Sequence, residues 1–243
     1  MWRMPESLRG REVVVVGGSG GIGAVVTDLL LDESARLVVS YRSNRARAER
    51  WSKSATLVRC DLASSADRAR LLDAAPGMYG LVVLAGDPAR VSRDSGIEAA
   101  ARISHDANYL GPILLAREAA DRMRASSKQG AIVLLSTMQA NALFAGSTFY
   151  AAQKAALQHA ARILAKECRG QVNIRVNVVS PGVTAAGMAE ASIAAGKYER
   201  FLKDGTIARY GRAADVARAI RFFLEPDNYV TGQVLCVDGG MTL

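Results

Sequence analysis

Short runs of consecutive apolar residues recur along the chain, separated by longer stretches in which apolar residues repeat with helical spacing. The runs are rich in Val, Ile and Leu, and they cover residues 12–16, 36–40, 56–60, 81–84, 131–136, 173–178 and 233–237. Strands that are covered on both faces, as in a parallel sheet, have this near-continuous apolar pattern. The pattern therefore predicts about seven buried parallel strands.

The stretches between the runs predict helices over residues 22–31, 44–52, 65–74, 96–124, 148–169 and 213–224. Ser64 is a candidate N-cap of the third helix. We expect Gly111-Pro112 to break or bend the fourth helix, because proline has no backbone N–H. Strands and helices in alternation, joined by right-handed crossovers, predict a doubly wound α/β fold with helices on both faces of one sheet.

The composition predicts a single domain over residues 1–243. Of the 243 residues, 50% are hydrophobic and 22% charged, which is enough for a large core. We see no membrane span, and residues 1–11 lack the apolar centre of a secretory signal. Cys60, Cys168 and Cys236 form no C-x-x-C pair, so we expect free thiols and a cytoplasmic location. With only His105 and His159, we expect neither a metal site nor a Ser-His-Asp triad.

The net charge is +8, and the densest basic cluster follows the second predicted strand. It consists of Arg42, Arg45, Arg47, Arg50 and Lys53. A basic chain can bind nucleic acid, but nothing in the cluster resembles a stacking platform of interleaved aromatic residues. We favour a cofactor phosphate as its partner, and we expect no nucleic acid and no membrane among the partners.

A glycine-rich turn lies between the first strand and the first helix. Glycine lets the backbone approach a pyrophosphate closely, and a helix N-terminus attracts anions. We predict a dinucleotide site made by Gly17, Ser19, Gly20, Gly21, Ile22 and Gly23. The alternative is a glycine turn without a ligand, and the strand–turn–helix context favours the site.

The end of the second strand, Tyr41-Arg42-Ser43, is where cofactor selection is expected. An acidic residue there would bind the ribose 2′-hydroxyl of NAD, but none is present. Arg42 can instead bind a 2′-phosphate through charge-assisted hydrogen bonds. We therefore predict NADP(H). The alternative is that Arg42 belongs to a solvated basic helix start.

Tyr150 and Lys154 lie four residues apart in the long Ala-rich helix, so both side chains are on one helix face. A free tyrosine has a pKa of about 10, and a nearby ammonium group lowers that pKa. The pair predicts proton transfer at a carbonyl or alcohol oxygen. Because this spacing is common in helices, its meaning depends on the other motifs.

Together, these motifs resemble the short-chain dehydrogenase/reductase family over essentially the whole chain. They are Gly17-x-x-x-Gly21-Ile-Gly23 and Tyr150-x-x-x-Lys154. The likeness is closest to the 3-oxoacyl-acyl carrier protein reductase branch, since the enoyl reductase branch spaces its tyrosine and lysine further apart. The resemblance implies a Rossmann-type sheet and an oxidoreductase.

The resemblance also implies roles for further residues. Thr137 stands thirteen residues before Tyr150, where the family has a serine that binds the substrate oxygen, with Ser136 as the alternative. Asn108 matches an asparagine that anchors a water of the proton relay. Cofactor contacts are implied for Asp61, Leu62, Ala85, Gly86, Tyr150, Lys154, Pro181, Gly182, Val183 and Thr184.

The chain departs from the family pattern at four positions. Val16 replaces a threonine, and Val83 and Leu84 replace two asparagines that brace the sheet and the cofactor pocket. Ala186 replaces a threonine that contacts the cofactor, and Thr184 is a candidate substitute.

We therefore expect a hydride transfer between NADP(H) and a carbonyl or secondary alcohol, such as a 3-oxoacyl thioester. Residues 183–207 are the expected substrate lid. The alternative is a cofactor-binding sensor without activity. The resemblance further implies a homotetramer or dimer, packed through helices 96–124 and 148–169.

Overall fold

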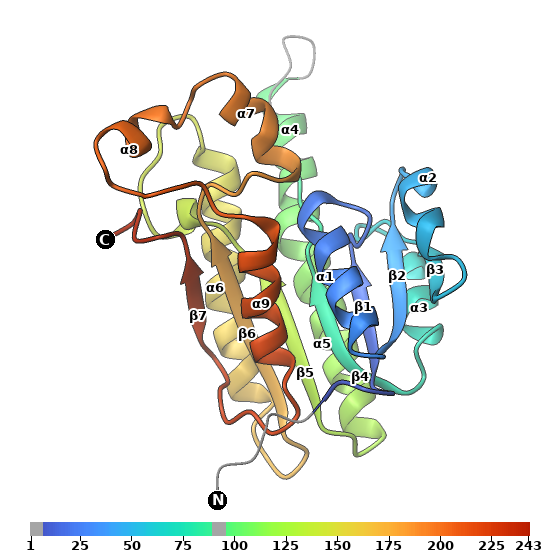
Figure 1. Ribbon diagram of the computed structural model, residues 1–243. Coiled ribbons are helices and arrows are strands. Elements are labelled where there is room, and N and C mark those ends of the chain that lie inside the picture. Colours follow the sequence, from blue (N-terminus) through green and yellow to red (C-terminus); the bar gives the residue numbers. More distant parts are fainter. Residues whose placement is uncertain (1–6, 89–95) are drawn as a thin grey trace, which may run out of the picture.

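One parallel sheet of seven strands runs through the molecule in the order β3-β2-β1-β4-β5-β6-β7 (Figure 1). The computed structural model describes residues 7–88 and 96–243. The strands are β1 (Glu12–Val16), β2 (Arg36–Tyr41), β3 (Ala55–Arg59), β4 (Met78–Val83), β5 (Gly130–Leu135), β6 (Ile174–Pro181) and β7 (Val234–Val237). The predicted doubly wound α/β fold is confirmed. The largest differences in bounds are that β4 starts at Met78 and that β6 continues to Pro181, where it pairs with β7.

Helices cover both faces of the sheet. One face carries α3 (Ser65–Asp73), α5 (Gly111–Ala125) and α6 (Thr148–Glu167), whose side chains share a buried cluster that includes Leu71, Leu115 and Leu157. The other face carries α1 (Gly21–Asp32) and α9 (Ala213–Leu224), with Val26 and Ile220 in a second cluster. These two helices lie in front of the sheet in Figure 1. The continuous apolar strands are thus buried on both sides, as their sequence predicts.

The fourth predicted helix does not break at Gly111-Pro112. Instead α4 (Ile97–His105) continues through a π-helical turn, η2 (Asp106–Leu110), directly into α5. Pro112 has no N–H to donate to the carbonyl of Asn108, and a π turn accommodates this without ending the helix. The turn places Asn108 at a buried position beside the end of β4.

Two shorter predicted helices also form. The helix expected over residues 44–52 appears as α2 (Arg45–Ala48) and the 3-10 turn η1 (Glu49–Trp51), and the Asn44 side chain accepts a hydrogen bond from the Arg47 N–H. Ser64 caps α3 as expected, since its hydroxyl accepts from the Asp67 N–H at 3.2 Å. None of the helices within the described ranges is long and apolar enough to cross a membrane.

The strand order reverses between β1 and β4, because β1 pairs with both β2 and β4. At such a switch point the connections leave in opposite directions and open a crevice outside the carboxyl ends of the strands. Residues 183–207, which contain η4 (Gly187–Ala189), α7 (Glu190–Ala194) and α8 (Glu199–Lys203), lie over this end of the sheet (Figure 1).

Candidate active site

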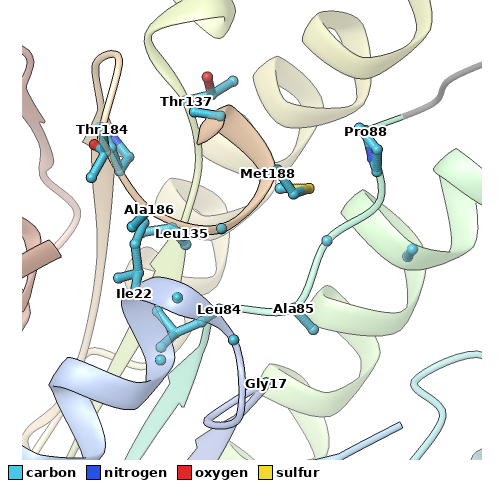
Figure 2. A pocket seen from close by; sticks show the side chains of 18 of the residues that line it. Gly17, Ile22, Leu84, Ala85, Pro88, Leu135, Thr137, Thr184, Ala186 and Met188 are labelled. Carbon is cyan, nitrogen blue, oxygen red and sulfur yellow. The ribbon is translucent and has the colours of Figure 1, made fainter. Parts of the chain in front are cut away.

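A cavity of about 970 Å³ lies at the carboxyl ends of the strands. It joins most of the residues that the sequence points to for cofactor and substrate. Those that line it are Gly17, Ser19, Gly20, Gly21, Ile22, Gly23, Arg42, Ser43, Asp61, Leu62, Ala85, Gly86, Thr137, Tyr150, Pro181, Gly182, Val183 and Thr184. Figure 2 shows part of this lining, with Gly17, Ile22, Leu84 and Ala85 at one end and Thr137 at the other. Tyr41, Asn108 and Lys154 do not line it.

The glycine turn presents the N-terminus of α1 to the cavity. The Gly20 N–H donates to the Gly17 carbonyl at 3.0 Å, and the first turn of α1 contains no acidic residue. Free N–H groups and the positive helix end therefore face this part of the cavity, which suits a pyrophosphate. The lid segment rests on the same turn, because a Cβ on Gly21 would lie 2.5 Å from the Gly187 nitrogen. Ala186 accordingly lies close to Ile22 in Figure 2.

The basic residues after β2 differ in their partners. Arg45 pairs with Glu49 at 3.1 Å, and Arg50 pairs with Asp28. Arg42 and Arg47 line the cavity, and within residues 7–88 and 96–243 neither guanidinium has a carboxylate partner. Both are therefore available to an anion. The sequence points to a phosphate for the whole basic cluster and singles out only Arg42 for the 2′-phosphate.

Asp61 and Leu62 line the cavity from a braced loop after β3. The Asp61 N–H donates to the Asp67 carboxylate at 2.9 Å. The buried guanidinium of Arg68 donates to the Leu62 carbonyl at 2.8 Å and is also bonded to Glu118. The backbone that would contact a nucleotide base is thus fixed by α3 and α5.

Tyr150 and Thr137 meet at the other end of the cavity. The Thr137 hydroxyl lies close enough to the phenol of Tyr150 to lower the pKa of that phenol by hydrogen bonding. Ser136, the alternative to Thr137, is committed elsewhere, because its hydroxyl donates to the Lys154 carbonyl at 3.2 Å and accepts from Gln158 at 3.0 Å. Thr137, and not Ser136, is therefore the hydroxyl residue that lies beside the Tyr150 phenol.

Lys154 and Asn108 lie directly behind Gly86. A Cβ on Gly86 would be 2.9 Å from Asn108 Oδ1 and 3.6 Å from Lys154 Nζ, so a side chain there would displace these groups. Lys154 Nζ donates to the Leu135 carbonyl at the end of β5, at 2.8 Å. The Lys154 ammonium group therefore lies behind the part of the cavity wall that Gly86 forms, and does not line the cavity itself.

Burial sets the protonation of the central pair. It raises the pKa of Tyr150 to about 12, although the hydrogen bond from Thr137 lowers it. Burial also lowers the pKa of Lys154 to about 7. The shift on Tyr150 is opposite to the one expected from a neighbouring lysine, because desolvation of the phenolate outweighs the effects of its neighbours. In this arrangement Tyr150 is a protonated phenol at neutral pH.

The departures from the family pattern have a structural explanation. Val16 and Val83 are 1% and 2% exposed and belong to the apolar cluster beneath α5 and α6. The Leu84 N–H donates to the Val16 carbonyl at 2.9 Å, so backbone bonding and apolar packing hold this strand end without the asparagine side chains. Thr184 faces the cavity but its hydroxyl donates to the Gly182 carbonyl at 3.2 Å.

Several lining residues lie outside the motifs from which the sequence predicts individual site residues. They are Asn44, Arg47, Pro88, Ala107, Met138, Gln139, Ser147, Met188, Glu190, Ser192, Lys197 and Tyr198. Most come from the loop after β5 or from the lid segment, and only the fold brings these segments together. In Figure 2, Met188 of the lid and Pro88 after β4 lie on facing sides of the cavity.

Known proteins with similar sequences are named as reductases. A family model described as enoyl-(acyl carrier protein) reductase matches residues 17–242. The chain is 33% identical to a 3-oxoacyl-[acyl-carrier-protein] reductase of Rattus norvegicus, over 94% of this chain and 97% of that protein. It is 30% identical to NADPH-dependent aldehyde reductase 2, chloroplastic, of Arabidopsis thaliana, over 98% and 96% of the two chains.

Solved structures with a similar fold are also oxidoreductases. A short chain dehydrogenase/reductase family protein superposes with a TM-score of 0.83 at 31% identity, over 98% of this chain and 99% of that one. A 7 alpha-hydroxysteroid dehydrogenase complexed with NADH and a 7-oxo bile acid superposes with a TM-score of 0.85 at 27% identity, over 96% and 95%. Fold, site and relatives define an oxidoreductase with a nicotinamide cofactor. The chain belongs to the short-chain dehydrogenase/reductase family.

Proposed function

We propose that this protein reduces a ketone to a secondary alcohol with NADPH, and that a 3-oxoacyl thioester or a related 3-oxo compound is its substrate. The observation that carries the proposal is the pairing of Tyr150 with Thr137 in the cavity that also contains the glycine turn and Arg42. Two hydroxyl groups at one end and an anion site at the other suit a carbonyl oxygen and a phosphorylated cofactor.

The choice of NADPH rests on charge. Arg42 and Arg47 present two cations after β2, where an acid would select NAD. None of the lining residues between Ser40 and Cys60 is acidic. Paired guanidinium groups favour a 2′-phosphate, which carries about two negative charges, over a hydroxyl. The name of the Arabidopsis relative includes NADPH, whereas the hydroxysteroid dehydrogenase structure contains NADH, so this choice needs its own test.

In the proposed reaction, Thr137 and Tyr150 hold the ketone oxygen. The bound nicotinamide supplies the hydride to the carbonyl carbon. Tyr150 donates its phenolic proton to the oxygen, and its high pKa keeps that proton in place at neutral pH. The protonated phenol is the form that can donate, so Tyr150 starts in the protonation state that reduction requires.

After Tyr150 has given up its proton, the phenolate must be reprotonated, and Lys154 is a nearby group that can supply the new proton. Lys154 lies in the same helix, and burial lowers the pKa of its ammonium group to about 7. A lysine with this pKa releases and takes up protons readily at neutral pH. Lys154 and the buried Asn108 therefore complete the proposed proton path to Tyr150.

The proposal is tested by following NADPH consumption with a panel of ketones and 3-oxoacyl thioesters, with NADH in parallel. Turnover with NADPH preferred is the expected result. A competing function, a cofactor sensor without activity, is favoured by the loss of the threonine at Ala186 and of the asparagines at Val83 and Leu84. It predicts NADPH binding without turnover of any ketone in the panel.

We also propose that the protein is a homo-oligomer, packed through the α4–α5 and α6 helices. Four large apolar side chains on these helices are exposed: Ile97 by 60%, Ile103 by 54%, Leu110 by 38% and Ile163 by 46%. Light scattering of the purified protein measures the assembly, and a monomer would contradict this proposal.

A further inference from the structure

Tyr198 is a second phenol at the candidate active site, and it comes from the lid segment. It stands between α7 and α8, at the N-cap of α8, and is 7% exposed. Its side chain belongs to a small apolar cluster with Met138, Val183, Ile207 and Met241. This cluster joins the lid to the loop after β5 and to the C-terminal segment, so it holds Tyr198 in one place.

Tyr198 lines the same cavity as Thr137 and Tyr150. The two phenols are within electrostatic reach of one another, because ionised Tyr198 raises the pKa of Tyr150. Met138, which packs in the cluster of Tyr198, follows Thr137 directly in the chain. The lid therefore places a buried tyrosine in the same cavity as Thr137 and Tyr150.

Glu190 and Lys197, two further polar residues that line the cavity from the lid, differ from Tyr198 in position. Glu190 and Lys197 are exposed. The Glu190 carboxylate accepts from the Gly187 N–H at 3.0 Å, and Lys197 Nζ lies 5.6 Å from the centre of the Tyr198 ring. A buried hydroxyl on a packed ring costs little side-chain entropy when it binds a ligand, whereas a long exposed side chain must first be ordered.

We propose that Tyr198 is a specificity-determining residue whose hydroxyl binds a second oxygen of the substrate, near the reacting carbonyl. Tyr150 and Thr137 together serve one carbonyl oxygen in the proposed reaction, and Tyr198 in the same cavity can serve a second oxygen of the substrate. The ligand class is a ketone with a neighbouring oxygen function, such as a 3-oxo ester or 3-oxo thioester, in preference to a simple ketone. This inference rests on the ketone reduction proposed above.

The experiment compares wild-type protein with Tyr198→Phe on two substrates of equal chain length, ethyl 3-oxobutanoate and heptan-2-one, at saturating NADPH. Tyr198→Phe removes only the hydroxyl and keeps the ring in its cluster. We expect kcat/KM for the ester to fall about 3- to 10-fold, mainly through KM, which is the loss expected for one neutral hydrogen bond. For the simple ketone the change should be less than about twofold.

Tyr210→Phe is the matched control. Tyr210 packs against the same cluster, and its hydroxyl has no hydrogen-bond partner among the described residues. This variant should leave kcat and KM for both substrates unchanged. A similar loss for both substrates in Tyr198→Phe would assign Tyr198 to lid structure alone and overturn the proposal, as would no loss for either.

The failure of this inference is distinct from the failure of the proposed function. If the wild-type protein reduces both substrates and Tyr198→Phe does not discriminate between them, ketone reduction stands and the role of Tyr198 is wrong. If the wild-type protein binds NADPH but reduces neither substrate nor any ketone in the panel, ketone reduction is wrong and the role of Tyr198 falls with it.

Discussion

The side-chain amide of Asn108 holds the backbone of Asp87 from both sides. Its Nδ2 donates to the Asp87 carbonyl at 2.7 Å, and its Oδ1 accepts from the Asp87 N–H at 3.0 Å. Nδ2 also donates to Ser104 Oγ at 3.0 Å. The π turn that carries Asn108 is thereby tied to the segment after β4, beside Gly86. This link holds the α4–α5 helix against the segment around Asp87, whose neighbours Gly86 and Pro88 line the cavity.

Asn108→Asp should weaken this link. The new carboxylate keeps one acceptor but turns an oxygen toward the Asp87 carbonyl, so we expect a loss of about 1–3 kcal/mol in the free energy of unfolding at neutral pH. Part of the loss should be recovered at lower pH, where the protonated carboxyl group donates again. Urea denaturation at two pH values measures both effects. Asn173→Asp, at an exposed position, is the control, and an equal loss there would contradict the assignment.

Arg42→Ala should impair NADPH far more than NADH. Removing a charge-assisted contact to the 2′-phosphate costs about 1.5–3 kcal/mol, which corresponds to about a 10- to 100-fold rise in KM for NADPH. Steady-state kinetics with both cofactors measure it. Arg45→Ala is the matched control, since Arg45 pairs with Glu49 and does not line the cavity. Equal effects of Arg42→Ala on the two cofactors would refute the predicted 2′-phosphate contact.

Tyr150→Phe should remove most turnover and keep cofactor binding. The substitution deletes the proton donor and leaves the ring in place, so we expect kcat to fall on the order of 10²–10⁴-fold. NADPH affinity, measured by fluorescence titration, should change little. Tyr229→Phe, at a fully exposed position, serves as the control. A Phe variant with full activity at position 150 would show that another group donates the proton.

Lys154 should make stability depend on pH. Burial lowers the pKa of Lys154 to about 7 in the folded protein, against about 10.4 for an exposed lysine. Between these values the unfolded chain binds more protons, so the free energy of unfolding should rise as pH increases from about 7 toward 10. Below about pH 7 both states carry the charge, and the full cost of burying it is present.

Lys154→Met removes this titration and keeps a side chain of similar length. The difference in stability between the wild-type protein and the variant should therefore change with pH, by an amount on the order of a few kcal/mol between pH values of about 7 and 9.5. The range ends below the point at which Tyr150, with its pKa of about 12, would contribute with the opposite sign. A constant difference across this range would mean that Lys154 titrates normally.

The sequence by itself determined the architecture. Consecutive Val, Ile and Leu mark strands that are buried on both faces, because only such strands have no polar face to show. The glycine turn between β1 and α1, and Tyr150 with Lys154 on one helix face, follow from local geometry alone. Arg42 at the end of β2 follows from strand position and the absence of an acid nearby.

Only the tertiary structure decided the pKa of Tyr150, the course of the helix at Pro112 and which further side chains line the cavity. The pKa of Tyr150 depends on how deeply the loop after β5 and the lid bury it, and burial depends on segments far apart in the sequence. Gly111-Pro112 predicted a break or bend, and the folded chain has a π turn over Asp106–Leu110 with the helix continuing into α5. The sequence places Arg47 in a basic cluster and Tyr198 in the expected lid, but only the fold shows that these two side chains line the cavity. Local patterns specify the elements, whereas desolvation and contacts between distant residues exist only once the chain is folded.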